Sequence, residues 1–122
     1  MRRLLLLLAA ITMSFFLSAD PAPETAPEQA EECPERIYAD SLYYGRGVER
    51  NPYKALEIYR ELVNGRSASE SDRAWSAYQL GKAYAEGIHV KRDKKLSGLY
   101  YRLAASLGSE EAEEEVAAED GS

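Results

Sequence analysis

The feature that most constrains this chain is a pattern that occurs twice. The stretch 45–59 is similar to the stretch 87–101, so that Gly45 aligns with Gly87 at an offset of about 42 residues. Self-similarity at a fixed period in this range is typical of solenoids, in which each repeat is one supersecondary unit. Such a unit cannot bury its apolar face alone, so it stacks on its neighbours. The pattern therefore predicts a binding protein rather than an enzyme, and it does not specify the partner.

The start of the chain has the three parts of a secretory signal peptide. Arg2 and Arg3 are basic, an apolar run continues to Leu17, and Ser18 with Ala19 precedes a polar turn. We expect residues 1–19 to be a signal peptide cleaved after Ala19, which predicts a periplasmic or secreted protein without membrane contact. The alternative is an uncleaved signal anchor, although the run is shorter than the about 20 apolar residues of a membrane-spanning helix.

Composition divides the rest of the chain into three parts. Residues 20–32 are rich in proline, alanine and glutamate and carry no large apolar side chain, which predicts a disordered linker. Residues 33–118 are long enough for one small domain. Residues 119–122 are expected to form a disordered tail.

Charge and cysteine content exclude several classes of partner. Without Arg2 and Arg3, 13 of the 15 basic residues remain against 21 acidic ones, a net charge near −8. Nucleic acids and anionic membranes attract clustered Lys and Arg, so we expect neither as a partner. Cys33 is the single cysteine, which excludes an internal disulfide. It is either paired with a partner or a small half-buried residue at the start of a helix.

Turn and capping residues predict five helices. Asn51 and Asp93 are placed as N-caps, and Gly45 and Gly87 as left-handed residues that end helices. No window alternates apolar and polar residues long enough for a strand, so the fold class is all-α. The expected helices run over 34–44, from Pro52 to a stop at Asn64–Gly65, over about 73–86, from Asp93 to Gly108, and onward from Ser109.

These residues carry a family resemblance. The stretch 80–93 is similar to the Sel-one-like repeat, a relative of the tetratricopeptide repeat, and the likeness recurs over 45–63. The positions that continue the match are Ser97, Tyr100, Tyr101, Ala104, Ala105 and Gly108. The resemblance implies an α-solenoid of antiparallel helix pairs, with about two and a half repeats. It also implies that Gly81 faces the second helix of its own pair, where a small residue lets the backbones approach.

The resemblance also implies where a partner binds. In tetratricopeptide-like stacks the first helix of each pair lines the concave groove. By position, the groove candidates are Arg36, Asp40, Tyr43, Tyr44, Trp75, Tyr78, Lys82 and Glu86. Trp75 and Tyr78 stand out because Trp, Tyr and Arg dominate interface energetics. For Trp75, a place in the core under the Ser-rich loop is an equal alternative.

No residue pattern indicates catalysis or metal binding. His89 has no acid or cysteine at ligand spacing, and we expect a structural residue in a left-handed turn position. The acidic stretch 110–115 lacks the glycine and alternating ligands of a calcium loop, which favours a solvated helix face. We therefore predict no catalytic residue, no metal and no cofactor.

The sequence thus predicts a non-enzymatic adaptor or scaffold that binds a protein or peptide partner in the cell envelope. The alternative is an enzyme or enzyme inhibitor that binds cell-wall ligands, because some cysteine-rich relatives of the repeat are credited with such activity. Those relatives pair a cysteine within each repeat, and this chain has no such pairs.

Overall fold

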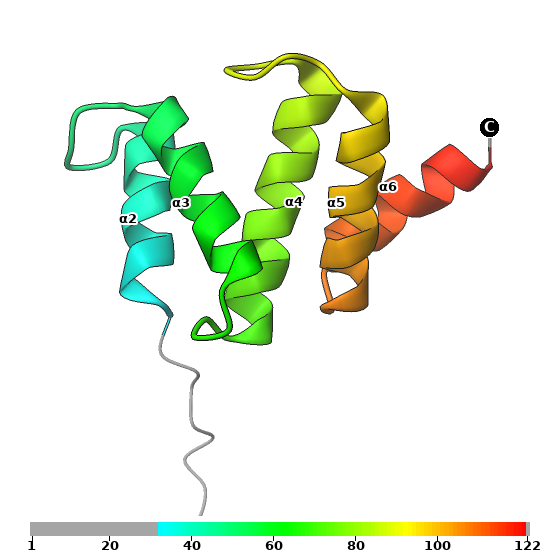
Figure 1. The fold of residues 1–122 in the computed structure, drawn as a ribbon, viewed down its shortest axis with the longest axis horizontal. Coiled ribbons are helices and arrows are strands. Elements are labelled where there is room, and N and C mark those ends of the chain that lie inside the picture. The colour runs from blue at the N-terminus through cyan, green and yellow to red at the C-terminus, as the bar shows by residue number, and fades with distance from the viewer. Residues whose placement is uncertain (1–31, 122) are drawn as a thin grey trace, which may run out of the picture. The chain divides into compact units, whose positions relative to one another are not determined.

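A computed structural model describes residues 32–121 of the chain, and this range contains five helices and no strand. In chain order the helices are α2 (Pro34–Tyr44), α3 (Pro52–Asn64), α4 (Glu70–Glu86), α5 (Lys94–Ser106) and α6 (Glu110–Asp120). Each helix packs antiparallel against the next one along the chain (Figure 1). The all-α solenoid of five helices is confirmed. The predicted signal peptide, and all but the last residue of the predicted linker, lie outside the described residues.

The helices begin where the capping residues predicted. The Asn51 side chain accepts a hydrogen bond from the Lys54 backbone N–H at 3.2 Å, and Pro52 is the first residue of α3. The Asp93 carboxylate accepts from the Leu96 backbone N–H at 3.0 Å in the same way. Each cap satisfies a backbone donor that has no partner inside its helix.

Two turns at the same end of the helical domain depend on residues in the left-handed backbone conformation. Gly45 and Gly87 have φ angles of 71° and 69°, and each ends the first helix of its pair. His89 has a φ of 63°, which confirms the left-handed position expected for it. Glycine adopts this conformation without a steric penalty, whereas a residue with a side chain pays about 1 kcal/mol or more.

The start of α4 differs from the prediction. This helix begins at Glu70, three residues before the expected start near Arg73. Ser69 is the N-cap, and its hydroxyl accepts from the Asp72 backbone N–H at 3.1 Å. The second half of the Ser-rich segment is therefore the first turn of a helix, with a Ser-x-x-Asp capping arrangement that the number of serines concealed.

The end of the chain is more helical than predicted. The Ser109 hydroxyl caps α6 as expected, accepting from the Ala112 backbone N–H at 3.2 Å. The helix continues through Asp120, so Glu119 and Asp120 belong to α6 rather than to a disordered tail over 119–122. Ala112 is fully buried where α6 packs on α5.

Small residues allow the helices of the second pair to approach closely. A Cβ atom on Gly81 would lie 2.7 Å from Cδ1 of Tyr101 in α5, which is closer than real side chains come. The Ser97 hydroxyl donates to the Gly81 carbonyl at 2.7 Å across the same interface. These distances confirm that Gly81 faces the second helix of its own pair.

Ionisation of Tyr101 makes the stability of this interface depend on pH in the alkaline range. Its side chain is 6% exposed, and burial, with a smaller contribution from the charge of Glu115, raises its pKa to about 12. The folded state therefore favours the neutral phenol. Its contribution to stability is complete below the ordinary value of 10.0 and is lost as the pH rises through about 12, because the unfolded chain ionises first.

We expect the free energy of unfolding to fall less steeply across this alkaline range in Tyr101→Phe than in the wild type. Urea denaturation at a series of pH values measures the slope. Tyr53→Phe is the control, because Tyr53 is 67% exposed, and this variant should keep the wild-type slope. Equal slopes for wild type and Tyr101→Phe would contradict the expectation.

Candidate functional site

The groove residues predicted from the sequence all lie on α2 and α4, whose side chains meet along the length of both helices. We call the eight residues together the α2–α4 surface: Arg36, Asp40, Tyr43, Tyr44, Trp75, Tyr78, Lys82 and Glu86. The Trp75 indole N–H donates to Asp40 Oδ1 at 2.9 Å near one end. Gln79 Nε2 donates to the Tyr44 hydroxyl at 3.2 Å farther along. The two helices thus present their side chains side by side.

Arg36 is the centre of an ion-pair network at the start of α2 and α4. Its guanidinium lies 2.7 Å from Asp72 Oδ1, 2.6 Å from Asp40 Oδ2 and 2.9 Å from Glu32 Oε2. The Arg36 side chain is 13% exposed and that of Asp72 only 4%. Such a pair fixes the relative position of two helices, and Arg36 is therefore a packing residue more than a charge at the rim of a groove.

Asp40 collects three hydrogen bonds from three helices. Arg36 donates from its own helix, Trp75 from α4, and the Tyr59 hydroxyl from α3. Tyr59 is fully buried, and burial, followed by the hydrogen bond to Asp40, raises its pKa well above the ordinary range. Asp40 thus supplies the acceptor that the polar ends of two buried or half-buried aromatic residues require.

Trp75 lies partly in the core and partly on the α2–α4 surface, which are the two places that the sequence left open. Its ring is half-buried and packs against the core, with the Arg36 guanidinium 5.9 Å from the ring centroid. The centroid of the Tyr78 ring lies 6.3 Å from that of Trp75, and Tyr78 is half-buried too. Trp75 therefore supports the α2–α4 surface from within while part of its ring faces outward.

The second half of the α2–α4 surface is more open. Tyr44 is 42% exposed, Tyr78 and Lys82 are half-buried, and Glu86 is exposed. The Lys82 ammonium lies 5.3 Å from the centroid of the Tyr78 ring, within the range of a cation–π contact. This half leaves aromatic area and charge partly exposed, whereas the charged side chains around Arg36 pair with one another.

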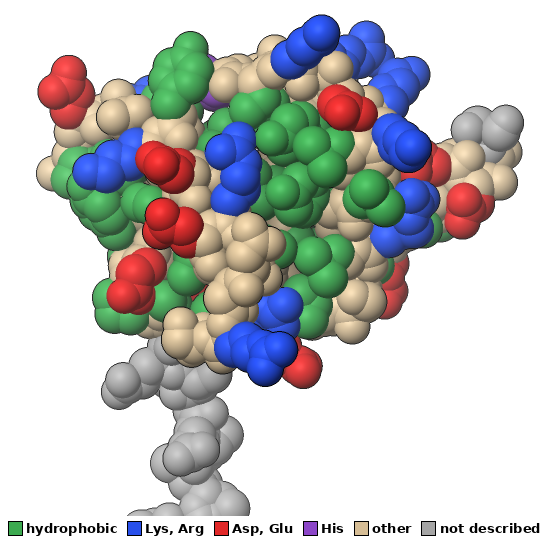
Figure 2. Space-filling view, viewed as in Figure 1, with side chains coloured by type: hydrophobic (Ala, Val, Ile, Leu, Met, Phe, Trp, Pro, Cys, Tyr) green, Lys and Arg blue, Asp and Glu red, His purple; other side chains and the backbone are tan. Residues whose placement is uncertain are grey.

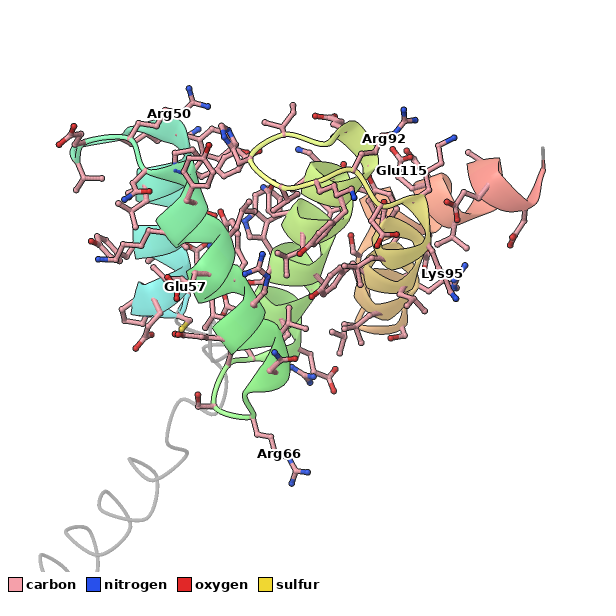
Figure 3. The ribbon with its side chains drawn as sticks, turned by 45° about the horizontal axis from the view of Figure 1, so that its top comes forward. Arg50, Glu57, Arg66, Arg92, Lys95 and Glu115 are labelled. Carbon is pink, nitrogen blue, oxygen red and sulfur yellow. The ribbon has the colours of Figure 1, made fainter. Side chains whose placement is uncertain are left out.

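Carboxylates and cations both act on the tyrosines of the open half. The Arg46 guanidinium lies 4.7 Å from the centroid of the Tyr44 ring, and the charge of Arg50 opposes the rise in the pKa of Tyr43. Burial raises the pKa of Tyr78, and the next causes are the charges of Glu115, Glu111 and Glu114 on α6. Burial likewise raises the pKa of Tyr43, followed by Tyr44 and Glu86. Glu115, labelled in Figure 3, comes from the middle of α6. The negative charge of α6, which packs on α5, thus acts on Tyr78 of α4.

Sequence reasoning missed three contributors to this surface. Asp72 and Gln79 are buried polar residues of α4, and the α6 carboxylates were expected to be a solvated face without a role. The available signal for Gln79 is its spacing, because it lies four residues after Trp75 and three before Lys82 on the same stripe. For Asp72 the Ser-x-x-Asp capping pattern was the signal.

His89 and Cys33, the other two residues considered as candidate sites, both make contacts within the domain. The His89 ring lies edge-on to Tyr43 at 6.4 Å and to Tyr53 at 5.3 Å, so it packs the second turn against the first pair. Half-buried Cys33 is the N-cap residue of α2, and its thiol donates to Glu35 at 2.8 Å.

Within residues 32–121, no cluster of three His, Cys, Asp or Glu has the geometry to hold a metal ion. In the same range, no helix has the length and apolar character needed to cross a membrane.

The opposite side, formed by α3 and α5, carries a different surface. Figure 2 shows hydrophobic side chains gathered between these helices, with Lys and Arg at the edge near the α4–α5 turn. Tyr84 and Tyr100 stack at 5.8 Å, and Arg60 of α3 donates to the Tyr84 hydroxyl at 3.2 Å. Both Asp and Glu and Lys and Arg side chains surround this hydrophobic area in Figure 2.

Comparison with known proteins supports the architecture. The family model of the Sel1 repeat matches residues 37–62 and 76–109. The first match spans most of α2 and α3, and the second spans the later part of α4, all of α5 and the cap of α6. No curated protein and no solved structure matches the chain significantly. Sel1 repeats typically act as scaffolds for protein interactions. This chain is a member of the Sel1 repeat family.

Proposed function

We propose that the domain is a non-enzymatic adaptor that binds a protein or peptide partner on the α2–α4 surface, in the concave groove of the solenoid. The observation that supports this proposal is the division of that surface into two halves. Around Arg36 the side chains hold each other in place, and beyond them Tyr44 and Tyr78 keep aromatic area exposed. Aromatic anchors on a rigid support are the common source of binding energy in interfaces.

We further propose that the adaptor works in the periplasm or outside the cell. Support comes from the sequence alone, from the basic pair at Arg2 and Arg3 and the apolar run that follows. Fractionation of the producing cells, with mass spectrometry of the mature N-terminus, tests the location and the cleavage after Ala19. Full-length protein retained in the cytoplasm would contradict it.

Site-specific crosslinking tests whether the α2–α4 surface carries the contact. A photoreactive residue at Tyr44 or Lys82 should crosslink a discrete partner in an envelope extract. The matched control is Leu99 of α5, which is 52% exposed on a helix outside this surface. Crosslinks from Leu99 alone would place the partner on the α3–α5 side and contradict the proposal.

Removing the exposed aromatic rings should show how much binding free energy they supply. We expect Tyr44→Ala with Tyr78→Ala to weaken the crosslinked partner by about 2 kcal/mol or more, with helix content unchanged. Isothermal titration and circular dichroism measure the two quantities. Trp75→Ala is a poorer probe, because its indole also donates to Asp40 and its loss disturbs the support. Unchanged affinity in the folded double variant would contradict the role of these rings.

A further inference from the structure

One face of α2 is open where the matching face of α4 is covered. The repeat offset of about 42 residues aligns α2 with the last part of α4, over 76–86. Ile37 and Tyr38 are 45% and 43% exposed, whereas their counterparts Gln79 and Leu80 are fully buried. The same contrast holds at three further positions, Pro34, Glu35 and Ser41 against Ser76, Ala77 and Ala83.

The contrast follows from the place of α2 in the stack. The first helix pair packs on α4, whereas no helix of the described residues precedes α2. The positions that a preceding helix would cover are therefore left to solvent, although two of them carry large apolar side chains. We call the following residues the open α2 face: Pro34, Ile37, Tyr38 and Ser41.

The open α2 face has the form of a helix-packing surface. Ile37 and Tyr38 lie four and three residues before Ser41, so all three side chains are on one side of the helix. The Ser41 hydroxyl donates to the Ile37 carbonyl at 2.9 Å, so its donor already has a partner within α2. A small residue with a satisfied donor, between larger apolar ones, lets a second helix approach closely.

Charges on α3 are separated along the open α2 face. At the α2–α3 turn the Lys54 ammonium lies 5.8 Å from the centroid of the Tyr38 ring. Both residues line a cavity of about 380 Å³, together with Arg50. At the opposite end, Glu35 and Glu61 line a cavity of about 180 Å³. The turn end of this side is thus basic, and the other end is acidic.

The remaining charged side chains near the open α2 face agree with this division. The turn end has three cations and one carboxylate: Arg46, Arg50 and Lys54 against Glu49. The other end has two carboxylates and one cation: Glu35 and Glu61 against Arg66. Glu57 lies midway along α3, and Arg36 is paired with Glu32, Asp40 and Asp72. Arg50 and Arg66, labelled in Figure 3, lie at these two opposite ends.

We infer that a second copy of this chain covers the open α2 face, with the two α2 helices antiparallel about a two-fold axis. The basic end of each copy then meets the acidic end of the other, so Lys54 lies opposite Glu61 of the partner subunit. A two-fold contact is self-complementary, so this charge pair forms twice. A parallel arrangement would bring like charges together, which is unfavourable.

The two kinds of side chain have different roles in this dimer. Ile37 and Tyr38 leave water at the centre of the contact and supply its affinity. Lys54 and Glu61 set the direction of the helices and the rate of encounter. The contact uses none of the residues of the α2–α4 surface, so that surface stays available to a partner.

Sedimentation velocity of the protein purified from its producing cells measures the association over a range of concentrations. We expect an equilibrium of monomer and dimer that shifts toward monomer as salt is added, because screening weakens the charge pairs. A monomer at every concentration up to about 1 mM would overturn the inference.

Two matched variants locate the contact. We expect Ile37→Lys to raise the dissociation constant of the dimer about tenfold or more, because a charge replaces apolar area at the centre. Leu99→Lys is the control, because Leu99 is 52% exposed on α5, and it should keep the wild-type constant. Circular dichroism checks that both variants are folded. Equal effects of the two substitutions would overturn the assignment to α2.

A charge exchange tests the antiparallel order. Lys54→Glu and Glu61→Lys should each weaken their own dimer about fivefold at low salt, because like charges then face each other. Mixed in equal amounts, the two variants should form a heterodimer with the wild-type dissociation constant, because both contacts again join opposite charges. Only a contact between position 54 of one copy and position 61 of the other produces this recovery. A mixture that associates no better than the separate variants would overturn the inference.

Discussion

The Arg36→Met variant is expected to lose about 3 to 5 kcal/mol of unfolding free energy, the largest effect of any single substitution considered in this chain. Arg36 lies within 2.7 Å of carboxylate oxygens of both Asp40 and Asp72, and its side chain is 13% exposed. Methionine keeps much of the volume but leaves these two carboxylates without their cation. The penalty comes from charge that stays buried, more than from the attraction that is lost.

Urea denaturation followed by circular dichroism measures this loss. Arg66→Met is the control, because Arg66 points away from the helices in Figure 3 and should tolerate the same change. Adding Asp72→Asn to Arg36→Met should recover part of the lost stability, because it removes one of the unpaired charges. An Arg36→Met protein as stable as Arg66→Met would show that water solvates the network, contrary to the burial of Asp72.

Enlarging Gly81 should be the second most damaging change. A Cβ at this position meets the Tyr101 ring at 2.7 Å, and Tyr101 is held by burial and by the Tyr78 ring at 5.9 Å. We expect Gly81→Leu to cost about 1–3 kcal/mol or more through overpacking, and Gly81→Ala somewhat less. The separation of α4 and α5 would also displace Tyr78, so partner affinity should fall along with stability.

Gly98 is the matched control for Gly81. It is a helical glycine of α5, and a Cβ there first meets the flexible side-chain ends of Glu119 at 3.3 Å and Arg102 at 3.5 Å. Gly98→Ala should therefore be neutral or stabilise the protein by up to about 1 kcal/mol, since alanine is the better helix former. A thermal midpoint of Gly81→Leu equal to that of the wild type would contradict the contact with Tyr101.

The helices that carry the α2–α4 surface were predicted from the sequence, but the organisation of its side chains was not. Positions 36, 40, 75 and 78 follow from the helical period and from the repeat register, and the structure brings them together. The sequence does not show that the Arg36 guanidinium forms ion pairs within the domain while Tyr44 and Tyr78 remain partly exposed. That division depends on Asp72, which lies 36 positions away along the chain but 2.7 Å away in space.

What the sequence determined by itself was the succession of helices. Asn51, Asp93 and Ser109 cap helices through bonds to residues three positions ahead, and Gly45 and Gly87 end helices through their own φ angles. These signals involve only residues within about one helical turn of each other, so they can be recognised in a single sequence. The start of α4 was predicted wrongly where a local signal, Ser69 with Asp72, was hidden among other serines.

Only the tertiary structure decided which faces of the helices meet. The Arg36–Asp72 pair, the contact of Tyr101 with Gly81 and the hydrogen bond from Trp75 to Asp40 each join different helices. Several rotations of an amphipathic helix bury similar apolar area, because hydrophobic burial has no direction. Close packing and hydrogen bonds select one of them, and both require coordinates from residues far apart in sequence.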